Sequence, residues 1–435
     1  MVRLPAFDAV LVFVGCVSFL GVLLLLAALS PVAAIVAIGF AGLLALIVSL
    51  GLVRTATAII LLAMFFAPLN NVRPSSAVSF VTAADLLFVL GFVLLAPVIV
   101  FRRVSPPLIF ILGSVILLST GLLASLGSFD PGVSVNHMAR LVVSALGLPV
   151  AFMFWRPDKR LVAILAGAYV AGQVYSIGYA LFAGGAEGGR YAGLATHANF
   201  FGLSSLLAAS LVPYVASLTP PSQRWMPWAA GVVCLYGIWI SGSRAALLVI
   251  LLIAVIYPLL ERSVKAAGLL AFAGAGVMIA AGRLFDDSGD NALSRLLGGG
   301  HASYSDVSRE QAMTVAIRSF EAHPLLGTGF INPLAAHNIY LEIVVAVGLS
   351  GLVGYGFILW SGVSGLFTLT KPFNQLAYPI FAYAAIGSIT NALWDRFIWA
   401  ALSLSLIAHL LAADEKVVEE DTFVPKNREL VEEKV

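Results

Sequence analysis

Residues 305–342 read SDVSREQAMTVAIRSFEAHPLLGTGFINPLAAHNIYLE, the most polar stretch between the long apolar runs of this chain. Its first half predicts an amphipathic helix, which Asp306 caps by accepting a bond from a backbone N–H. One apolar stripe along this helix is predicted, because apolar residues recur at a spacing of three and four residues: Ala312, Met313, Ala316, Ile317 and Phe320. His323-Pro324 is expected to end this helix, and glycines 327 and 329 allow the turn that follows.

The composition identifies lipid as the solvent of the chain. It has 435 residues, of which 60% are hydrophobic and 11% charged, and its mean hydropathy is +1.01. A water-soluble domain has about 25% charged residues. The formal net charge of +2 gives no reason to expect a nucleic-acid partner. Cys16 and Cys234 both lie inside apolar runs, so neither a disulfide framework nor a zinc site follows from them.

The apolar runs predict an all-α, polytopic membrane protein with about 12–14 transmembrane helices, since a spanning helix needs roughly 20 mostly apolar residues. The first run is long enough to span and is interpreted as an uncleaved helix, with Arg3 holding its start inside. The predicted spans are 7–29, 31–52, 55–68, 81–101, 107–127, 138–155, 161–183, 199–218, 226–242, 245–260, 266–282, 338–363, 376–393 and 397–413.

Lysine and arginine are enriched in cytoplasmic loops, and this rule gives a consistent orientation along the chain. The predicted cytoplasmic turns and tail contain Arg54, Arg102, Arg103, Arg156, Lys159, Arg160, Arg224, Arg262, Lys265, Lys371 and the segment 414–435. The same orientation places 184–198 and 283–336 on the outer side. The predicted division is 1–183 N-terminal helices, 184–282 central helices, 283–337 periplasmic loop, 338–413 C-terminal helices and 414–435 cytoplasmic tail.

Several arginines lie on the outer side against this trend: Arg190, Arg244, Arg283, Arg295, Arg309 and Arg318. For Arg283, Arg295 and Arg318 we favour a solvated loop, where nearby acids balance their charge. Arg190 and Arg244 have fewer acidic neighbours in sequence. An arginine near the membrane usually faces the protein interior or a water-filled cavity. Its planar fork suits phosphate, so these arginines indicate an anion site.

Two short segments place polar groups beside such arginines. In GGRYAG, residues 188–193, Arg190 is followed by His197 and Asn199 at the start of a helix, where anions are favoured. An ordinary Gly-rich connection is the alternative. In SGSR, residues 241–244, Ser243 and Arg244 stand at a helix break and predict a small polar pocket, or else a tight outer hairpin.

His337 is the histidine best placed for chemistry, because Asn338 and the start of a spanning helix follow it directly. An imidazole is the usual general base near neutral pH, although a lone interfacial histidine is more often structural. The histidines show no metal-ligand spacing. The sequence also lacks a P-loop, a dinucleotide glycine pattern, a Gly-x-Ser-x-Gly elbow and an Asp-x-Asp cluster. We therefore expect no metal and no cofactor.

The segments SGSR, HPLLGTGF, HNIYLE and GLSG, within residues 186–365, resemble the O-antigen ligase and polymerase superfamily. This resemblance implies a GT-C-like, metal-independent, inverting glycosyltransferase of the bacterial inner membrane, active at the periplasmic face. Its donor would be an undecaprenyl-diphosphate-linked glycan. The resemblance assigns diphosphate binding to Arg190, Arg244 and Arg309 and activation of the acceptor hydroxyl to His337. The motifs add Asn199, Ser243, Asn338, Tyr340 and Glu342 as secondary residues. Around Arg309 the sequence departs from the common pattern.

The favoured function is O-antigen ligase, with lipid A-core as the acceptor in lipopolysaccharide biosynthesis. One long outer loop that ends at the histidine favours a ligase over the closest alternative, an O-antigen or exopolysaccharide polymerase. A secondary transporter is the alternative from another class. It predicts internal repeats and charges near the bilayer midplane, whereas here the polar residues lie at the outer face.

Overall fold

The computed structural model describes residues 21–22, 30–74, 81–185, 189–265, 267–268, 291–297, 302–331 and 336–416. These ranges contain helices and loops and no strand, which confirms the all-α fold. Outside the described residues lie nearly all of the predicted span 7–29, most of 266–282, Arg283 and nearly all of the tail.

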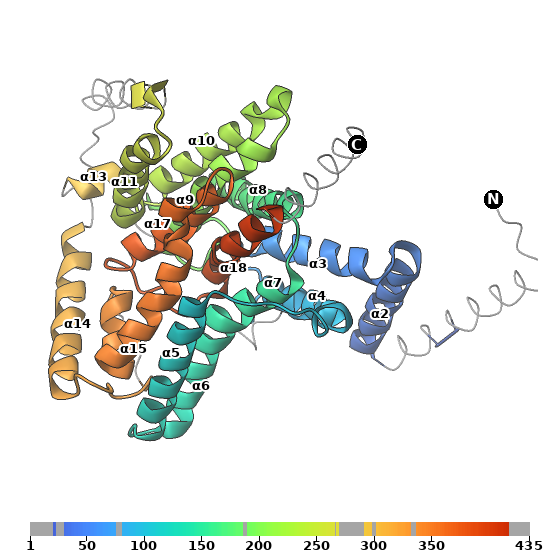
Figure 1. Ribbon diagram of the computed structural model, residues 1–435. Coiled ribbons are helices and arrows are strands. Elements are labelled where there is room, and N and C mark those ends of the chain that lie inside the picture. Colours follow the sequence, from blue (N-terminus) through green and yellow to red (C-terminus); the bar gives the residue numbers. More distant parts are fainter. Residues whose placement is uncertain are drawn as a thin grey trace, which may run out of the picture.

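The helices follow the predicted runs closely (Figure 1). In chain order they are α2 (Pro31–Leu50), α3 (Leu52–Phe66), α4 (Ala83–Ile99), α5 (Leu108–Leu126), α6 (Pro131–Val142), η2 (Val143–Gly147), α7 (Leu148–Trp155), α8 (Lys159–Ala183), α9 (Ala198–Leu218), η4 (Pro221–Gln223), α10 (Trp225–Ile240), α11 (Arg244–Leu260), α13 (Ala292–Leu296), α14 (Ala302–Ala322), α15 (Ile339–Val363), α16 (Gly365–Thr368), η5 (Phe373–Ala377), α17 (Tyr378–Ile386) and α18 (Arg396–Leu406).

Within the described ranges, six helices or merged helices are long and apolar enough to cross a membrane. Four further apolar helices are shorter: Ile35–Leu50, Leu52–Phe66, Ala83–Ile99 and Arg244–Leu260. Many large apolar side chains point outward, including Phe101 and Phe182 at 85% and 96% exposure, as expected of a surface that faces lipid. The chain is thus a multi-pass membrane protein. The predicted total of 12–14 spans stays a prediction.

The core of the molecule surrounds α9, which packs against α8, α10, α11, α17 and α18 (Figure 1). Tyr169 of α8, Phe201 of α9 and Trp399 of α18 are fully buried there. Because α9 is enclosed by other helices, its first turn is held at the centre of one end of the molecule. This turn is the part of α9 that matters for the site.

The predicted span 376–393 is not one continuous helix. Helix α17 ends at Ile386, and residues 387–395 form a loop before α18. Neighbouring elements bind the carbonyl groups of this loop: Ile339 N–H donates to Gly387 O at 2.7 Å, and the Trp399 indole donates to Leu393 O at 3.0 Å. Irregular backbone at membrane depth is tolerated where protein groups satisfy it. The loop contains Gly387, Ser388, Thr390 and Asn391, which favour a turn, but the apolar residues on both sides led to the prediction of one continuous span.

Two of the sequence motifs pack directly against each other. The turn Pro324–Gly329 lies on α15 where that helix is interrupted at Gly348, with φ 68° and ψ −172°. Thr328 N–H donates to Val345 O and Gly329 N–H to Ala346 O, both at 2.9 Å. A Cβ at Gly348 would lie 2.1 Å from the carbonyl oxygen of Leu325. HPLLGTGF and GLSG therefore form one docking contact that fixes the end of α14 relative to α15.

Helix α14 agrees with the predicted amphipathic helix at its end and differs at its start. It ends at Ala322, directly before His323-Pro324. The prediction that Asp306 caps it is wrong, because the helix begins at Ala302. On the apolar stripe, Ala316 and Phe320 pack with residues of α15, whereas Met313 and Ile317 are 45% and 38% exposed. The contact of α14 with α15 is narrow.

Three of the predicted cytoplasmic basic residues form ion pairs away from the first turn of α9. Ion pairs join Arg156 to Asp414, Lys159 to Glu415 and Lys371 to Glu261. Lys159 begins α8, and the other end of that helix, Ala183, leads to the loop before α9. These three basic residues of the predicted cytoplasmic turns and the first turn of α9 thus lie at opposite ends of the bundle.

Candidate functional site

A pocket at the end of the bundle where α9 begins brings together three arginines from three separate segments. Arg244 begins α11, Arg295 lies in α13 and Arg309 lies in α14. Asn199, Gly242, Ser243, Ala245, Ile386, Ile389 and Thr390 complete the lining. None of these described lining residues is acidic. We call this the arginine pocket. Its charge and its planar donor groups fit a polyanion such as a diphosphate.

Arg190 belongs to the same assembly through its partners rather than by lining the pocket. Its Nε donates to Ser241 O at 2.9 Å, and its Nη2 donates to Asn199 Oδ1. Tyr191 N–H also donates to Ile240 O at 3.1 Å. These bonds fix the loop before α9 against the end of α10. Arg190 therefore orients Asn199, which does line the pocket.

The SGSR segment forms a tight break between α10 and α11, as its composition predicts. Gly242 takes φ 63°, a conformation that favours glycine. Ser241 Oγ accepts from Ser243 N–H at 3.1 Å, and Ser243 caps α11 through a bond from Ala246 N–H. Arg244 and Ala245, in the first turn of α11, line the arginine pocket. A helix N-terminus favours an anion at that place.

Arg295 is a member of the pocket that the sequence assigned to a solvated loop. The structure contradicts that assignment, since Arg295 is 5% exposed and donates from Nη1 to Gly242 O at 3.2 Å. Asn291 caps the short helix α13 by accepting from the N–H groups of Leu293 and Ser294. No signal in the local sequence identified Arg295, because its partner Gly242 lies far away in the chain. Arg318, in contrast, is exposed on α14, as expected.

His337 lies directly before α15 in a left-handed conformation with φ 50°. Asn338 caps α15 by accepting from Leu341 N–H at 3.0 Å. The bond from Ile339 N–H to Gly387 O and a second from the Tyr340 hydroxyl to Ala384 O fasten this helix start to α17. Because Ile386 and Ile389 of the adjacent segment line the arginine pocket, the same contact places the mouth of α15 beside that pocket.

The electrostatics join His337 to the arginines. Burial lowers the pKa of His337, and the charges of Arg309 and His197 lower it further. Burial also lowers the pKa of His197, followed by the charges of Arg190, Arg309 and Arg295. Both histidines thus lie in the field of Arg309. At neutral pH the His337 imidazole is uncharged and able to accept a proton.

The secondary residues have positioning contacts. Asn199 accepts from Arg190, Ser243 and Asn338 cap helices, and Tyr340 donates to α17. Glu342 is 7% exposed in the first turn of α15 and interacts electrostatically with Asp395. The contacts of Asn199, Ser243, Asn338 and Tyr340 hold the starts of α9, α11 and α15, whereas Glu342 and Asp395 are acidic neighbours. Among the described residues, no group of three or more His, Cys, Asp or Glu side chains could hold a metal ion.

Residues 229–356 match the family model described as O-antigen ligase. The match confirms the predicted resemblance to the O-antigen ligase superfamily. It contains Arg244, Arg295, Arg309 and His337, whereas Arg190 and Asn199 precede it. No curated protein matches the chain.

The O-antigen ligase match supports a ligase-type or polymerase-type function, and with it a glycosyltransferase-like activity. It also implies glycan-linked lipid substrates and a lipid acceptor in general. The matched segment contains all three arginines that line the arginine pocket.

Proposed function

We propose that the protein is an O-antigen ligase. It transfers a glycan from undecaprenyl diphosphate to lipid A-core at the periplasmic face of the bacterial inner membrane. The observation that carries this proposal is the arginine pocket itself: three guanidinium groups line one pocket, and Arg309 also acts on a half-buried, neutral His337. The long predicted outer loop that ends at His337 favours a ligase over a polymerase.

In the proposed reaction, an acceptor hydroxyl attacks the anomeric carbon of the donor sugar while His337 accepts the hydroxyl proton. A new C–O bond forms, the bond from the anomeric carbon to the diphosphate oxygen breaks, and undecaprenyl diphosphate leaves with the electron pair. Arg244, Arg295 and Arg309 stabilise the charge that develops on the diphosphate, with Arg190 orienting Asn199. Fixed donors of this kind act most strongly where water is excluded. One direct attack inverts the anomeric configuration.

The test is a reconstitution with purified protein, an undecaprenyl-diphosphate glycan and lipid A-core, in the presence of a chelator. We expect glycan on lipid A-core, and a loss of about 10²–10⁴-fold in rate for His337→Asn, the range that a general base contributes. Asparagine tolerates the left-handed backbone at this position, so the variant removes the imidazole without adding strain. Elongation of the donor without transfer to lipid A-core would instead assign a polymerase. Uptake of a solute without transfer would assign a transporter.

A further inference from the structure

A second polar cavity lies at the same end of the bundle as the arginine pocket. It encloses about 280 Å³, and its lining comes from five stretches of the chain. Its charged lining residues are Arg73, Arg140, Asp85, Asp395 and Arg396. We call it the flanking cavity. It shares no residue with the lining of the arginine pocket.

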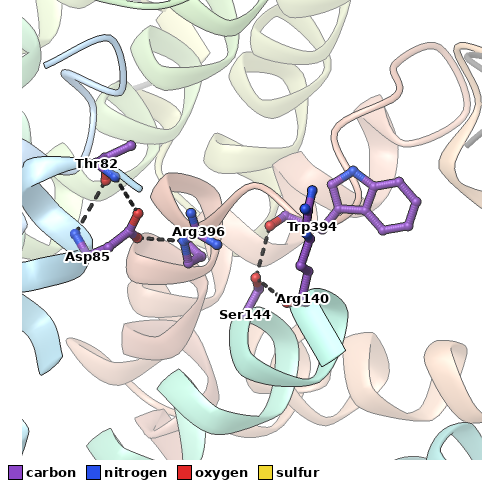
Figure 2. A network of polar contacts seen from close by, with 6 residues as sticks. All are labelled: Thr82, Asp85, Arg140, Ser144, Trp394 and Arg396. Carbon is purple, nitrogen blue, oxygen red and sulfur yellow. Dashed lines mark hydrogen bonds and ion pairs between the residues drawn. The ribbon is translucent and has the colours of Figure 1, made fainter. Parts of the chain in front are cut away.

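The flanking cavity is a built site rather than a gap between helices. Asp85 Oδ2 accepts from Thr82 N–H at 2.7 Å, and its Oδ1 accepts from Arg396 Nε at 2.6 Å (Figure 2). Ser144 Oγ donates to the backbone oxygens of Arg140 and Trp394 at 2.7 and 2.9 Å. Through Asp85, the first two bonds join the start of α4 to the Arg396 side chain of α18, and the bonds of Ser144 join η2 to the loop before α18. They fix the Arg396 guanidinium and the backbone at Arg140.

The lining of the flanking cavity is net positive. Three arginines face two aspartates, and one aspartate, Asp85, already binds Arg396. Burial raises the pKa of the other, Asp395, to about 7, although Arg396 opposes this shift. Asp395 is thus partly protonated near neutral pH, which leaves the cations in excess. A net positive cavity favours an anion, and guanidinium groups bind phosphate and carboxylate alike.

The first turn of α9 is the wall between the two sites. Thr196 and Phe200 line the flanking cavity, whereas Asn199 lines the arginine pocket. Asn70 of the flanking cavity fixes this wall by accepting from Thr196 N–H at 2.8 Å. His197 stands within the same turn, and its charge acts on His337. His197 is therefore at the boundary between the two cavities, and its electrostatic interaction with His337 places that imidazole near the boundary.

We propose that the flanking cavity binds an anionic group of the acceptor, a phosphate or carboxylate on its sugars, and so presents the acceptor hydroxyl to His337 across the first turn of α9. This inference rests on the proposed function, in which the donor diphosphate occupies the arginine pocket. Both substrates must reach His337. The two cationic sites, one on each side of the first turn of α9, would each bind one substrate. Holding each substrate by its charge orients the reacting groups before reaction.

The variants for the test are Arg73→Gln and Arg140→Gln, with Arg103→Gln as a control for an exposed arginine at the opposite end of the molecule. Arg73 is exposed at the rim, so its variant is expected to fold normally. In the reconstituted reaction we expect each of the two cavity variants to raise KM for lipid A-core about tenfold. The KM for the donor should stay within about twofold, and Arg103→Gln should change neither.

Modified acceptors identify the anion. Removal of phosphate groups by phosphatase, or esterification of sugar carboxyl groups, should raise the wild-type KM for the acceptor in one of the two cases. With that modified acceptor, Arg73→Gln and Arg140→Gln should no longer differ from the wild type, because the two changes remove the same interaction. An unchanged acceptor KM in both variants, or a raised donor KM instead, would overturn the inference.

Binding of labelled lipid A-core to the purified protein, without donor, separates this inference from the proposed function. Weaker binding by Arg73→Gln and Arg140→Gln than by wild type and Arg103→Gln supports the acceptor site, even where no transfer is seen. Equal binding by all four proteins contradicts it. A wild-type protein that binds lipid A-core but transfers nothing to it would contradict the ligase reaction alone.

Discussion

His337 combines a strained backbone with an uncharged side chain. Its φ of 50° directs the chain from the loop into α15, and the cap at Asn338 holds it there. Non-glycine residues with positive φ are uncommon and are often found at functional sites. Burial and the neighbouring cations keep the imidazole in its basic form. The two features together give an oriented proton acceptor at the edge of the arginine pocket.

The first prediction concerns the pH dependence of transfer. His337 accepts a proton only when neutral, so kcat/KM for the acceptor should rise with pH through the pKa of His337 and then level off. Because that pKa is lowered from 6.5, the acid limb should lie below pH 6.5. Arg309→Gln removes a charge that lowers this pKa and should move the limb to higher pH. Arg318→Gln, the exposed control on α14, should leave it in place. A limb above pH 6.5 in the wild type would contradict this assignment of the base.

The burial of Arg295 could not be predicted from the sequence. The sequence places it among nearby aspartates in an outer loop, and nothing in its spacing distinguishes it from the exposed Arg318. Its burial depends on the contact of α13 with α11 and on the carbonyl of Gly242, which lies far away in sequence. His337 and Arg244, in contrast, stand at helix starts that hydropathy does locate.

At the scale of elements, the docking of the Pro324–Gly329 turn on α15 determines where α14 sits. Gly327 and Gly348 both take positive φ, and a side chain at either would meet backbone atoms of the other segment. Ser350 Oγ donates to Leu325 O at 2.7 Å and closes the same contact. Because α14 carries Arg309, the two motifs position a pocket residue that neither of them contains.

We therefore predict that Gly348→Ala destabilises the protein and impairs transfer. The strained backbone alone costs about 1–3 kcal/mol, and the clash with Leu325 adds to it. The matched control is Gly356→Ala in the same helix, where a Cβ meets no atom within 4 Å. That change should be neutral or slightly stabilising. Thermal unfolding in detergent measures both, and equal midpoints for the two variants would contradict the docking role.

The elements themselves were largely predictable, because long apolar runs mark helices directly. Helices α8, α9 and α15 lie within a few residues of the predicted spans. The break after Ile386 was not predicted, although Gly387, Ser388, Thr390 and Asn391 favour a turn, because apolar residues on both sides suggested one continuous span. The partner of the Gly387 carbonyl, Ile339 N–H, lies far away in sequence and is absent from any local window.

Across the whole molecule, the two ends of the bundle differ in how their charged residues are paired. At one end, basic residues of the turns form ion pairs with Glu261, directly after α11, and with acids after α18. The other holds two cationic sites whose arginines come from loops and helix starts. The basic turns predict that the first end is cytoplasmic, and the cationic sites then face the periplasm.

This orientation predicts the accessibility of two exposed serines. In a background with Cys16→Ser and Cys234→Ala, Ser388→Cys beside the arginine pocket should react with a membrane-impermeant maleimide in intact spheroplasts. Ser222→Cys in η4 should react only after the membrane is permeabilised. Both serines are exposed, so the difference reports the side of the membrane rather than burial. The reverse pattern would place the site in the cytosol and refute a periplasmic transfer.

The most direct test of the central claim is the affinity of the purified protein for an undecaprenyl-diphosphate glycan without acceptor. We predict that Arg244→Gln and Arg309→Gln each weaken binding about tenfold or more, since each removes a charge-assisted contact to the diphosphate. His337→Asn and the exposed control Arg318→Gln should bind as the wild type does, within about twofold. Unchanged affinity in both pocket variants, or a loss in His337→Asn as large as in them, would contradict the claim.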